Sequence, residues 1–182
     1  MLIKIETSGV EVLYSIYFDY KNCKGVVYDE KEVNELENKW FGNREGNVLT
    51  LDIVEIAYLL LNNKIKVLGN NNTAITDLDS FLSTYYKCVE NFFWPKLIVY
   101  RDLRNRGRKV KVFGENKFLM KDKHGDLKLV VVLEEGMRHS VVDIYRNIDS
   151  SRSNNLKLVY AIVSLQGDLT YYELNKIEPV RD

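Results

Sequence analysis

Alternating apolar and polar positions dominate the first 28 residues and most of the chain after Gly107. Such alternation in β-branched and aromatic residues is typical of strands that bury one face. The glycine-centred triplets HGD and QGD are expected to be turns between strands. The segments predicted to be strands are VEVLYSIYF, IKVLG, RKVKVFG, KFLMKD, LKLVVVL, SVVDIY, KLVYAIVS and LTYYEL.

A helical period replaces this alternation in the middle of the chain. A helix is predicted over residues 29–40, and a second one begins at a cap, Thr50 or Asp52, because a short side-chain oxygen there can accept a bond from an unpaired N–H. A third helix is predicted from residue 75, with a break or restart at Trp94-Pro95 and an end at Gly107. The segment FGNREGN is expected to be a loop and NNN at 70–72 a turn.

These elements predict an α+β protein made of two small α/β domains, residues 1–85 and 86–182. In the second domain one helix leads into a central mixed sheet flanked by helices, and a nearly continuous apolar strand lies at its centre. A chain of 182 residues can bury one substantial core or two small ones.

Charge is distributed unevenly although the net charge is zero. Residues 1–85 hold 8 Lys and Arg against 13 Asp and Glu, and residues 86–182 hold 18 against 13. Such asymmetry predicts that the second half meets a polyanion and the first half something basic, and the alternative is that the charge runs are solvated faces. Six basic residues lie within eleven positions: Arg101, Arg104, Arg106, Arg108, Lys109 and Lys111.

The two cysteines and the absence of long apolar runs exclude several classes of protein. Cys23 and Cys88 are 65 residues apart, without CxxC spacing or a nearby histidine pair, so both are expected to be reduced core thiols rather than zinc ligands or a disulfide. No apolar run reaches the ~20 residues of a membrane span, and the N-terminus does not have the pattern of a signal peptide. We therefore expect a cytoplasmic protein with no metal, no cofactor and no membrane partner.

Several blocks of the sequence resemble the archaeal tRNA-splicing endonucleases. In the second half these are VYRDLRNRGRKVK, GMRHSVV and LVYAIVSLQGDLTYYELNKIEP, and in the first half GNREGNVLTLDIVEIAYLLLNNKIKV. The resemblance covers about residues 40–68 and 96–179. It implies cleavage of folded precursor tRNA at the bulges that flank an intron, without metal. The 2′-hydroxyl of the RNA attacks, and a tyrosine, a histidine and a lysine assist it.

Only one of these three catalytic groups is found where the resemblance places it. His139, in RHS, is at the histidine position. Around the tyrosine position the chain has Leu129, Val130 and Val131, which carry no hydroxyl. The lysine position falls on Leu156, and Lys157 beside it would point to the opposite face of a strand. Because only RNIDSSRSNN lies between Tyr145 and Leu156, most of the long helix before that position is expected to be missing.

The resemblance therefore implies a structural subunit, which would assemble with a catalytic subunit in a two-plus-two heterotetramer on precursor tRNA. Contact with RNA or with the partner is assigned to the six basic residues listed above and to Arg138. A terminal strand that pairs with a related subunit would contribute Tyr171, Tyr172 and Leu174, with one tyrosine in the core and the other at the interface. Asp168, in the SLQGD turn, corresponds to an acidic loop that enters a basic cleft of the partner.

Two other readings remain open from the residues. One is an active metal-independent nuclease that uses His139 with Tyr145 and Lys157 as displaced helpers. The other is a metal-dependent nuclease or a stand-alone RNA-binding module, in which Asp126 and Glu134 would bind magnesium. Eight residues of regular strand separate these two carboxylates by ~27 Å, which is too far for one ion.

Overall fold

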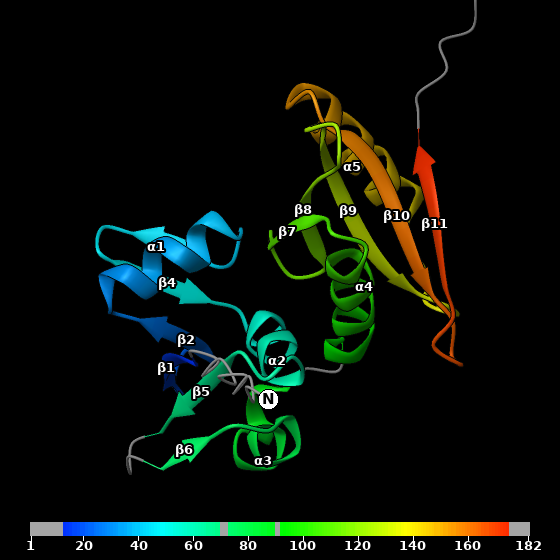
Figure 1. Cartoon of the computed structure of the whole chain (residues 1–182). Coiled ribbons are helices and arrows are strands. Elements are labelled where there is room, and N and C mark those ends of the chain that lie inside the picture. The colour runs from blue at the N-terminus through cyan, green and yellow to red at the C-terminus, as the bar shows by residue number, and fades with distance from the viewer. Residues whose placement is uncertain (1–12, 70–72, 90–91, 175–182) are drawn as a thin grey trace, which may run out of the picture.

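In the residues that the structure describes, the first half of the chain forms a six-stranded sheet with three helices (Figure 1). The computed structural model describes residues 13–69, 73–89 and 92–174, so the predicted turn at 70–72 lies outside the described residues. The strand order is β3-β4-β2-β1-β5-β6, in which β1 pairs antiparallel with β2 and parallel with β5. The elements are β1 (Tyr14–Asp19), β2 (Lys24–Val27), α1 (Glu30–Asn38), β3 (Asn43–Glu45), β4 (Val48–Leu51), α2 (Ile53–Leu61), β5 (Ile65–Leu68), β6 (Ala74–Ile75), α3 (Leu78–Thr84) and the 3-10 turn η1 (Tyr86–Cys88).

Helix α2 begins where the sequence predicts a cap. The Asp52 carboxylate accepts from the Val54 backbone N–H, and Glu55 accepts from the Asp52 N–H, which satisfies two donors that the first turn would otherwise leave unpaired. Thr50, the other predicted cap, lies in β4. Seven of the nine residues of α2 are buried, so this helix lies at the centre of the first domain.

The second half forms a five-stranded mixed sheet in the order β11-β10-β9-β8-β7. Parallel strands β9 and β10 are joined by α5, which lies on one face of the sheet, while α4 lies on the other face, toward the first domain (Figure 1). In the described part of the chain no helix is long and apolar enough to span a bilayer. The elements are α4 (Phe93–Asn105), β7 (Lys109–Val112), β8 (Lys117–Lys121), β9 (Leu127–Glu134), α5 (Val141–Ser153), β10 (Lys157–Val163) and β11 (Leu169–Leu174).

Alternate residues of the central strands enter two separate clusters of apolar side chains. Val130 and Val159 point toward α4, into a large cluster that continues through α2 to the first sheet. Val131 and Leu158 point toward α5, into a small cluster that is closed by partly buried side chains of that helix. The fold is therefore α+β with two α/β units, as predicted, and one continuous core joins the units.

Local pattern gave the wrong structure in three places. The helix predicted from residue 75 begins at Leu78, after β6, and its break lies before Phe93, so that Trp94-Pro95 is inside α4. FGNREGN is not only a loop, because Asn43–Glu45 forms β3 and pairs with β4 around Gly46, whose φ is +61°. SVVDIY is not a strand: Ser140 caps α5 by accepting from the Val142 N–H, and the helix then runs for 13 residues. The expectation that most of this helix is missing was therefore also wrong.

The prediction of reduced cysteines is wrong as well. Cys23 and Cys88 form a disulfide, with their Cα atoms 5.4 Å apart. Cys23 lies in the turn between β1 and β2 with φ +52°, and Cys88 ends η1. Their sequence separation of 65 hides this proximity, because it depends on how the chain after α3 returns to the β1–β2 turn.

Candidate functional site

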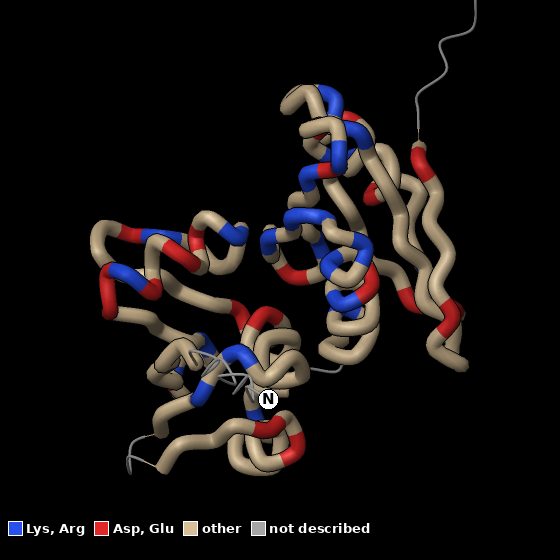
Figure 2. The backbone as a smooth tube through the Cα atoms, viewed as in Figure 1, with Lys and Arg blue, Asp and Glu red and all other residues tan. Residues whose placement is uncertain are grey.

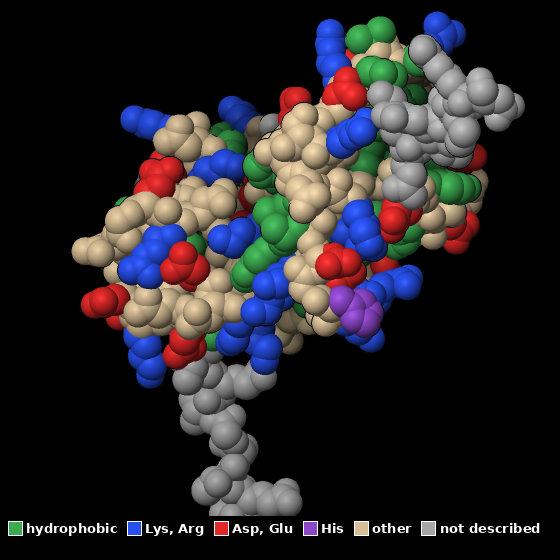
Figure 3. Space-filling model, turned by 90° about the horizontal axis from the view of Figure 1, so that it is seen from above, with side chains coloured by type: hydrophobic (Ala, Val, Ile, Leu, Met, Phe, Trp, Pro, Cys, Tyr) green, Lys and Arg blue, Asp and Glu red, His purple; other side chains and the backbone are tan. Residues whose placement is uncertain are grey.

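The basic segment at the end of α4 and along β7 is the first candidate site. Lys and Arg gather around this helix end and strand in the backbone view (Figure 2). From above, basic side chains lie over both domains and are interspersed with acidic ones (Figure 3). The residues of this segment nevertheless have different environments. Some of their side chains bind groups inside the chain, and others are exposed on its surface.

Arg104 is used inside the chain. Its guanidinium donates to the carbonyl oxygens of Lys39 and Trp40, at 2.7 and 2.6 Å, and to that of Val110 at 2.6 Å. It also lies 3.9 Å from the centre of the Phe41 ring. These contacts join α4 to the loop between α1 and β3, so Arg104 links the two domains.

Arg106 takes part in a contact between α4 and the last strand. Its guanidinium pairs with Asp102 at 2.8 Å and lies over the Tyr171 ring, 5.8 Å from its centre. The Tyr171 hydroxyl donates to Asp102 at 2.7 Å, and burial together with this carboxylate raises the pKa of Tyr171. Tyr171 thus points into the chain, whereas Tyr172 is 54% exposed.

Lys109 and Lys111 of β7 and Lys121 of β8 point to the same face of the sheet. Lys109 is directly opposite Lys121, and Lys111 is opposite Leu119. Lys109 donates to the Asn38 carbonyl at 3.4 Å. Like charges directly opposite one another are destabilising in a sheet, which favours an anion as a neighbour of this face. Arg101 is exposed on α4 and Arg108 is half-buried before β7.

His139 lies in the turn before α5, next to the exposed Arg138, and lines a pocket of about 360 Å³. The pocket is formed between the sheet and the first half of α5. Tyr160 is at its base, 6% exposed, and its hydroxyl accepts from Asn147 at 3.3 Å. Its lining is Asn116, Lys117, Val131, Leu133, His139, Asp143, Ile144, Arg146, Asn147 and Tyr160.

The positions that should hold a catalytic tyrosine and lysine are aliphatic and buried. Leu129, Val130 and Val131 lie in β9 and are each at most 2% exposed. Leu156 packs with the α5 cluster, and Lys157 points to the other face, where it pairs with Asp126 at 3.4 Å. His139 therefore has neither expected companion.

The displaced helpers are not brought together with His139 either. Neither Tyr145 nor Lys157 lines the pocket that contains His139. Tyr145 is 52% exposed on α5, and Lys157 lines a different pocket at the start of β10.

The exposed end of the second sheet is formed by β11 and the turn before it. Asp168 is exposed in this turn, and its N–H donates to the Ser164 hydroxyl at 3.0 Å. The Leu165 N–H donates to Glu135 at 3.3 Å, which ties the turn to the loop after β9. Leu174 is half-buried against the α5 cluster.

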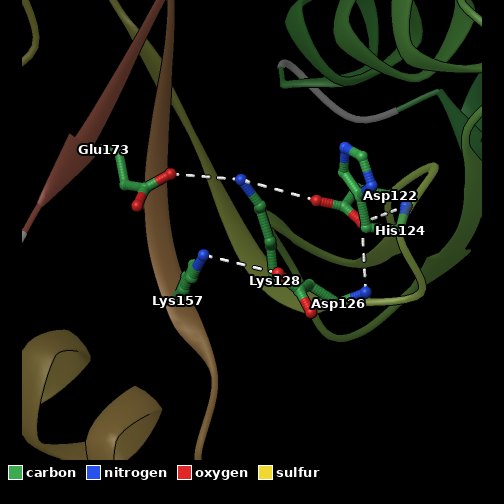
Figure 4. Close-up of polar contacts among 6 residues, drawn as sticks. All are labelled: Asp122, His124, Asp126, Lys128, Lys157 and Glu173. Carbon is green, nitrogen blue, oxygen red and sulfur yellow. Dashed lines mark hydrogen bonds and ion pairs between the residues drawn. The ribbon is translucent and has the colours of Figure 1, made fainter.

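Ion pairs attach β11 to the turn between β8 and β9. Lys128 lies between Glu173 and Asp122, at 3.1 and 3.9 Å, and Lys157 pairs with Asp126 beside them (Figure 4). Backbone donors and Lys128 lower the pKa of Asp122, although its partial desolvation opposes them.

The two carboxylates considered for magnesium do not converge. Asp126 precedes β9, whereas Glu134 is the last residue of that unbroken strand. In the described part of the chain no three His, Cys, Asp or Glu residues are grouped to hold a metal ion.

Sequence reasoning missed Lys117 and Tyr160 as neighbours of His139. Lys117, His139 and Tyr160 come from three separate segments of the chain. Only the strand order β10-β9-β8 brings them to one pocket. The pairing of Lys117 with Val131 supplies this proximity, and no local pattern in the sequence encodes it.

Comparisons with known proteins agree over most of the chain. Residues 16–81 match the family described as tRNA intron endonuclease, N-terminal domain, and residues 93–171 match tRNA intron endonuclease, catalytic C-terminal domain. A tRNA-splicing endonuclease of Pyrococcus horikoshii is 34% identical over 154 residues, covering 82% of this chain and 89% of the relative. That of Pyrococcus furiosus is 34% identical over 157 residues, covering 81% and 89%. One from Methanococcus vannielii is 26% identical over 160 residues, covering 84% and 89%.

Proposed function

Because this chain belongs to the tRNA intron endonuclease family, we propose that it is a structural subunit of a tRNA-splicing endonuclease and that a separate catalytic subunit cleaves the precursor tRNA. The assembly would hold two copies of each chain. Residues 1–85 and 86–182 would be the two domains of this chain, and the assembly would act in the cytoplasm.

One observation carries the proposal. Where the family places its catalytic tyrosine, β9 has only aliphatic side chains, which are buried and cannot exchange a proton. Three groups share the work of proton removal, proton donation and charge stabilisation, and the loss of one from such a unit removes most of the rate. A chain with His139 alone therefore contributes assembly rather than chemistry.

The surfaces of the second domain would divide between RNA and partner. Exposed Tyr172 and the β11 edge, together with the Asp168 turn, suit a partner chain, because an unpaired edge strand presents backbone groups for pairing. Lys109 and Lys111 on β7, with exposed Arg101, suit RNA phosphates. Arg104 is not part of this surface, since its donors are used inside the chain.

The test is cleavage of labelled intron-containing precursor tRNA in the presence of a chelator. The reaction would contain this chain alone, a candidate catalytic family member alone, or both. We expect cleavage only in the mixture, and His139→Ala in this chain should leave the rate of the mixture within about twofold. Robust cleavage by this chain alone would contradict the structural role.

A second candidate function is cleavage by this chain itself, favoured by one observation. His139, Lys117 and Tyr160 line the same pocket, so a histidine, a lysine and a tyrosine do meet there, although from other positions than the family uses. In that case the chain alone would cleave, and Lys117→Met and His139→Ala would each lower the rate at least tenfold.

A further inference from the structure

We infer that the Cys23–Cys88 disulfide is a thiol–disulfide exchange site, which a dithiol reductant opens in the folded protein. The inference does not depend on the proposed function. It rests on where the disulfide lies, on a pocket that reaches it, and on a buried cation beside it.

The disulfide is accessible from one side. Cys23 is half-buried in the turn after β1, whereas Cys88 is 4% exposed. Both cysteines line a pocket of about 110 Å³ that is also lined by Lys24, Asp52 and Lys96. An incoming thiolate can therefore approach Cys23, while Cys88 is the sulfur left inside.

Lys96 places a positive charge in this pocket. It lies in α4, is 5% exposed, and its ammonium has no hydrogen bond or ion pair with any residue that the structure describes. The carboxylate of Asp52 is already paired with Lys24 at 2.6 Å. A nearby ammonium lowers the pKa of a thiol, and a leaving thiol of lower pKa departs faster.

The exchange would proceed in two balanced steps. A thiolate of the dithiol attacks the sulfur of Cys23, which forms a mixed disulfide and expels the Cys88 thiolate beside Lys96. The second thiol of the same reductant, as its thiolate, then attacks the reductant's first sulfur, which is bonded to Cys23 in the mixed disulfide. This step closes the reductant's own disulfide and releases the Cys23 thiolate. The dithiol is oxidised to a disulfide by two electrons, and the two cysteines are reduced and take up its two protons.

Opening would change how the two domains are connected. Cys88 ends η1, which lies between α3 of the first domain and α4 of the second. The disulfide ties this connection to the β1–β2 turn, so reduction frees it there.

The test measures the rate of reduction by dithiothreitol in native buffer. Samples are quenched with iodoacetamide, and the alkylated cysteines are counted by mass spectrometry. Far-UV circular dichroism is followed in parallel, together with the rate of global unfolding from denaturant jumps. We expect both cysteines to become alkylated at least tenfold faster than the protein unfolds, with helical signal retained.

Three variants test the role of the buried cation. Lys96→Met keeps the length of the side chain and should slow reduction about tenfold, whereas Lys96→Arg restores the charge and should return the rate to within about twofold of the parent. Lys87→Met removes an exposed lysine next to Cys88 and should leave the rate within twofold. Reduction no faster than unfolding, free thiols in the untreated protein, or an unchanged rate in Lys96→Met would each overturn the inference.

Discussion

At the scale of single residues, the buried carboxyl group of Glu55 is a source of pH-dependent stability. It is 2% exposed, and its oxygens accept from the Gly42 and Asp52 N–H groups, both at 2.9 Å. Desolvation outweighs these two bonds and raises the pKa of Glu55 to about 7. The folded protein therefore holds this proton more tightly than the unfolded chain does.

We predict that the free energy of unfolding falls as pH rises from about 4.5 to about 7, by up to ~3 kcal/mol from this group. The sign follows from the raised pKa: below this range Glu55 is protonated in both states, and above it the folded state holds a buried charge. Denaturant unfolding across this range checks the slope. Glu55→Gln should flatten it while lowering stability at pH 5, because one backbone donor loses its acceptor. If Glu55→Gln kept the parent's dependence of unfolding free energy on pH, another group would be responsible for it.

At the scale of secondary structure, α5 shows what a local pattern can and cannot predict. Val141, Val142 and Ile144 are β-branched, which favours a strand locally, but they are followed by Ile148 and Ser151 at helical spacing on the side that faces the sheet. The cap at Ser140 and the parallel pairing of β9 with β10 favour the helix, since two parallel strands need a crossover connection, which α5 provides. Helix α2 and the end of α4 at Gly107 were predictable, because each carries its own cap.

We predict that Ser140→Ala lowers the free energy of unfolding by ~1 kcal/mol, since the Val142 N–H loses its acceptor. Ser150→Ala is the matched control at an exposed position in the last turn of the same helix and should change stability by no more than ~0.5 kcal/mol. Urea unfolding of the two variants decides this prediction. Equal effects would mean that the cap does not define the start of α5.

At the scale of the whole molecule, the two domains share one core, and polar contacts from Arg104 and Lys109 also connect them. The large apolar cluster runs from the first sheet through α2 and α4 to the second sheet, and Arg104 binds the loop of the first domain at its edge. The pattern of predicted elements indicated two domains, but it could not predict this continuity, because α2 and α4, which are in contact, begin 40 positions apart in the sequence. The pocket around His139 was unpredictable for the same reason.

We predict that Arg104→Met lowers the free energy of unfolding by ~2 to 4 kcal/mol, because the carbonyls of Lys39, Trp40 and Val110 lose a charged donor. Arg101→Met, on the exposed side of the same helix, should cost no more than ~0.5 kcal/mol. Calorimetry should show a single transition for the parent. Two separate transitions in the parent would contradict a shared core.

The two edges of the second sheet differ in a way that limits how copies can aggregate. Edge strand β7 carries Lys109 and Lys111, and a charged edge resists pairing with another strand. The opposite edge, β11, has the uncharged Thr170 and Tyr172 among its exposed residues. Because β7 resists pairing, strand addition to this sheet is restricted to β11, and two copies that paired there would leave only β7 edges in the joined sheet.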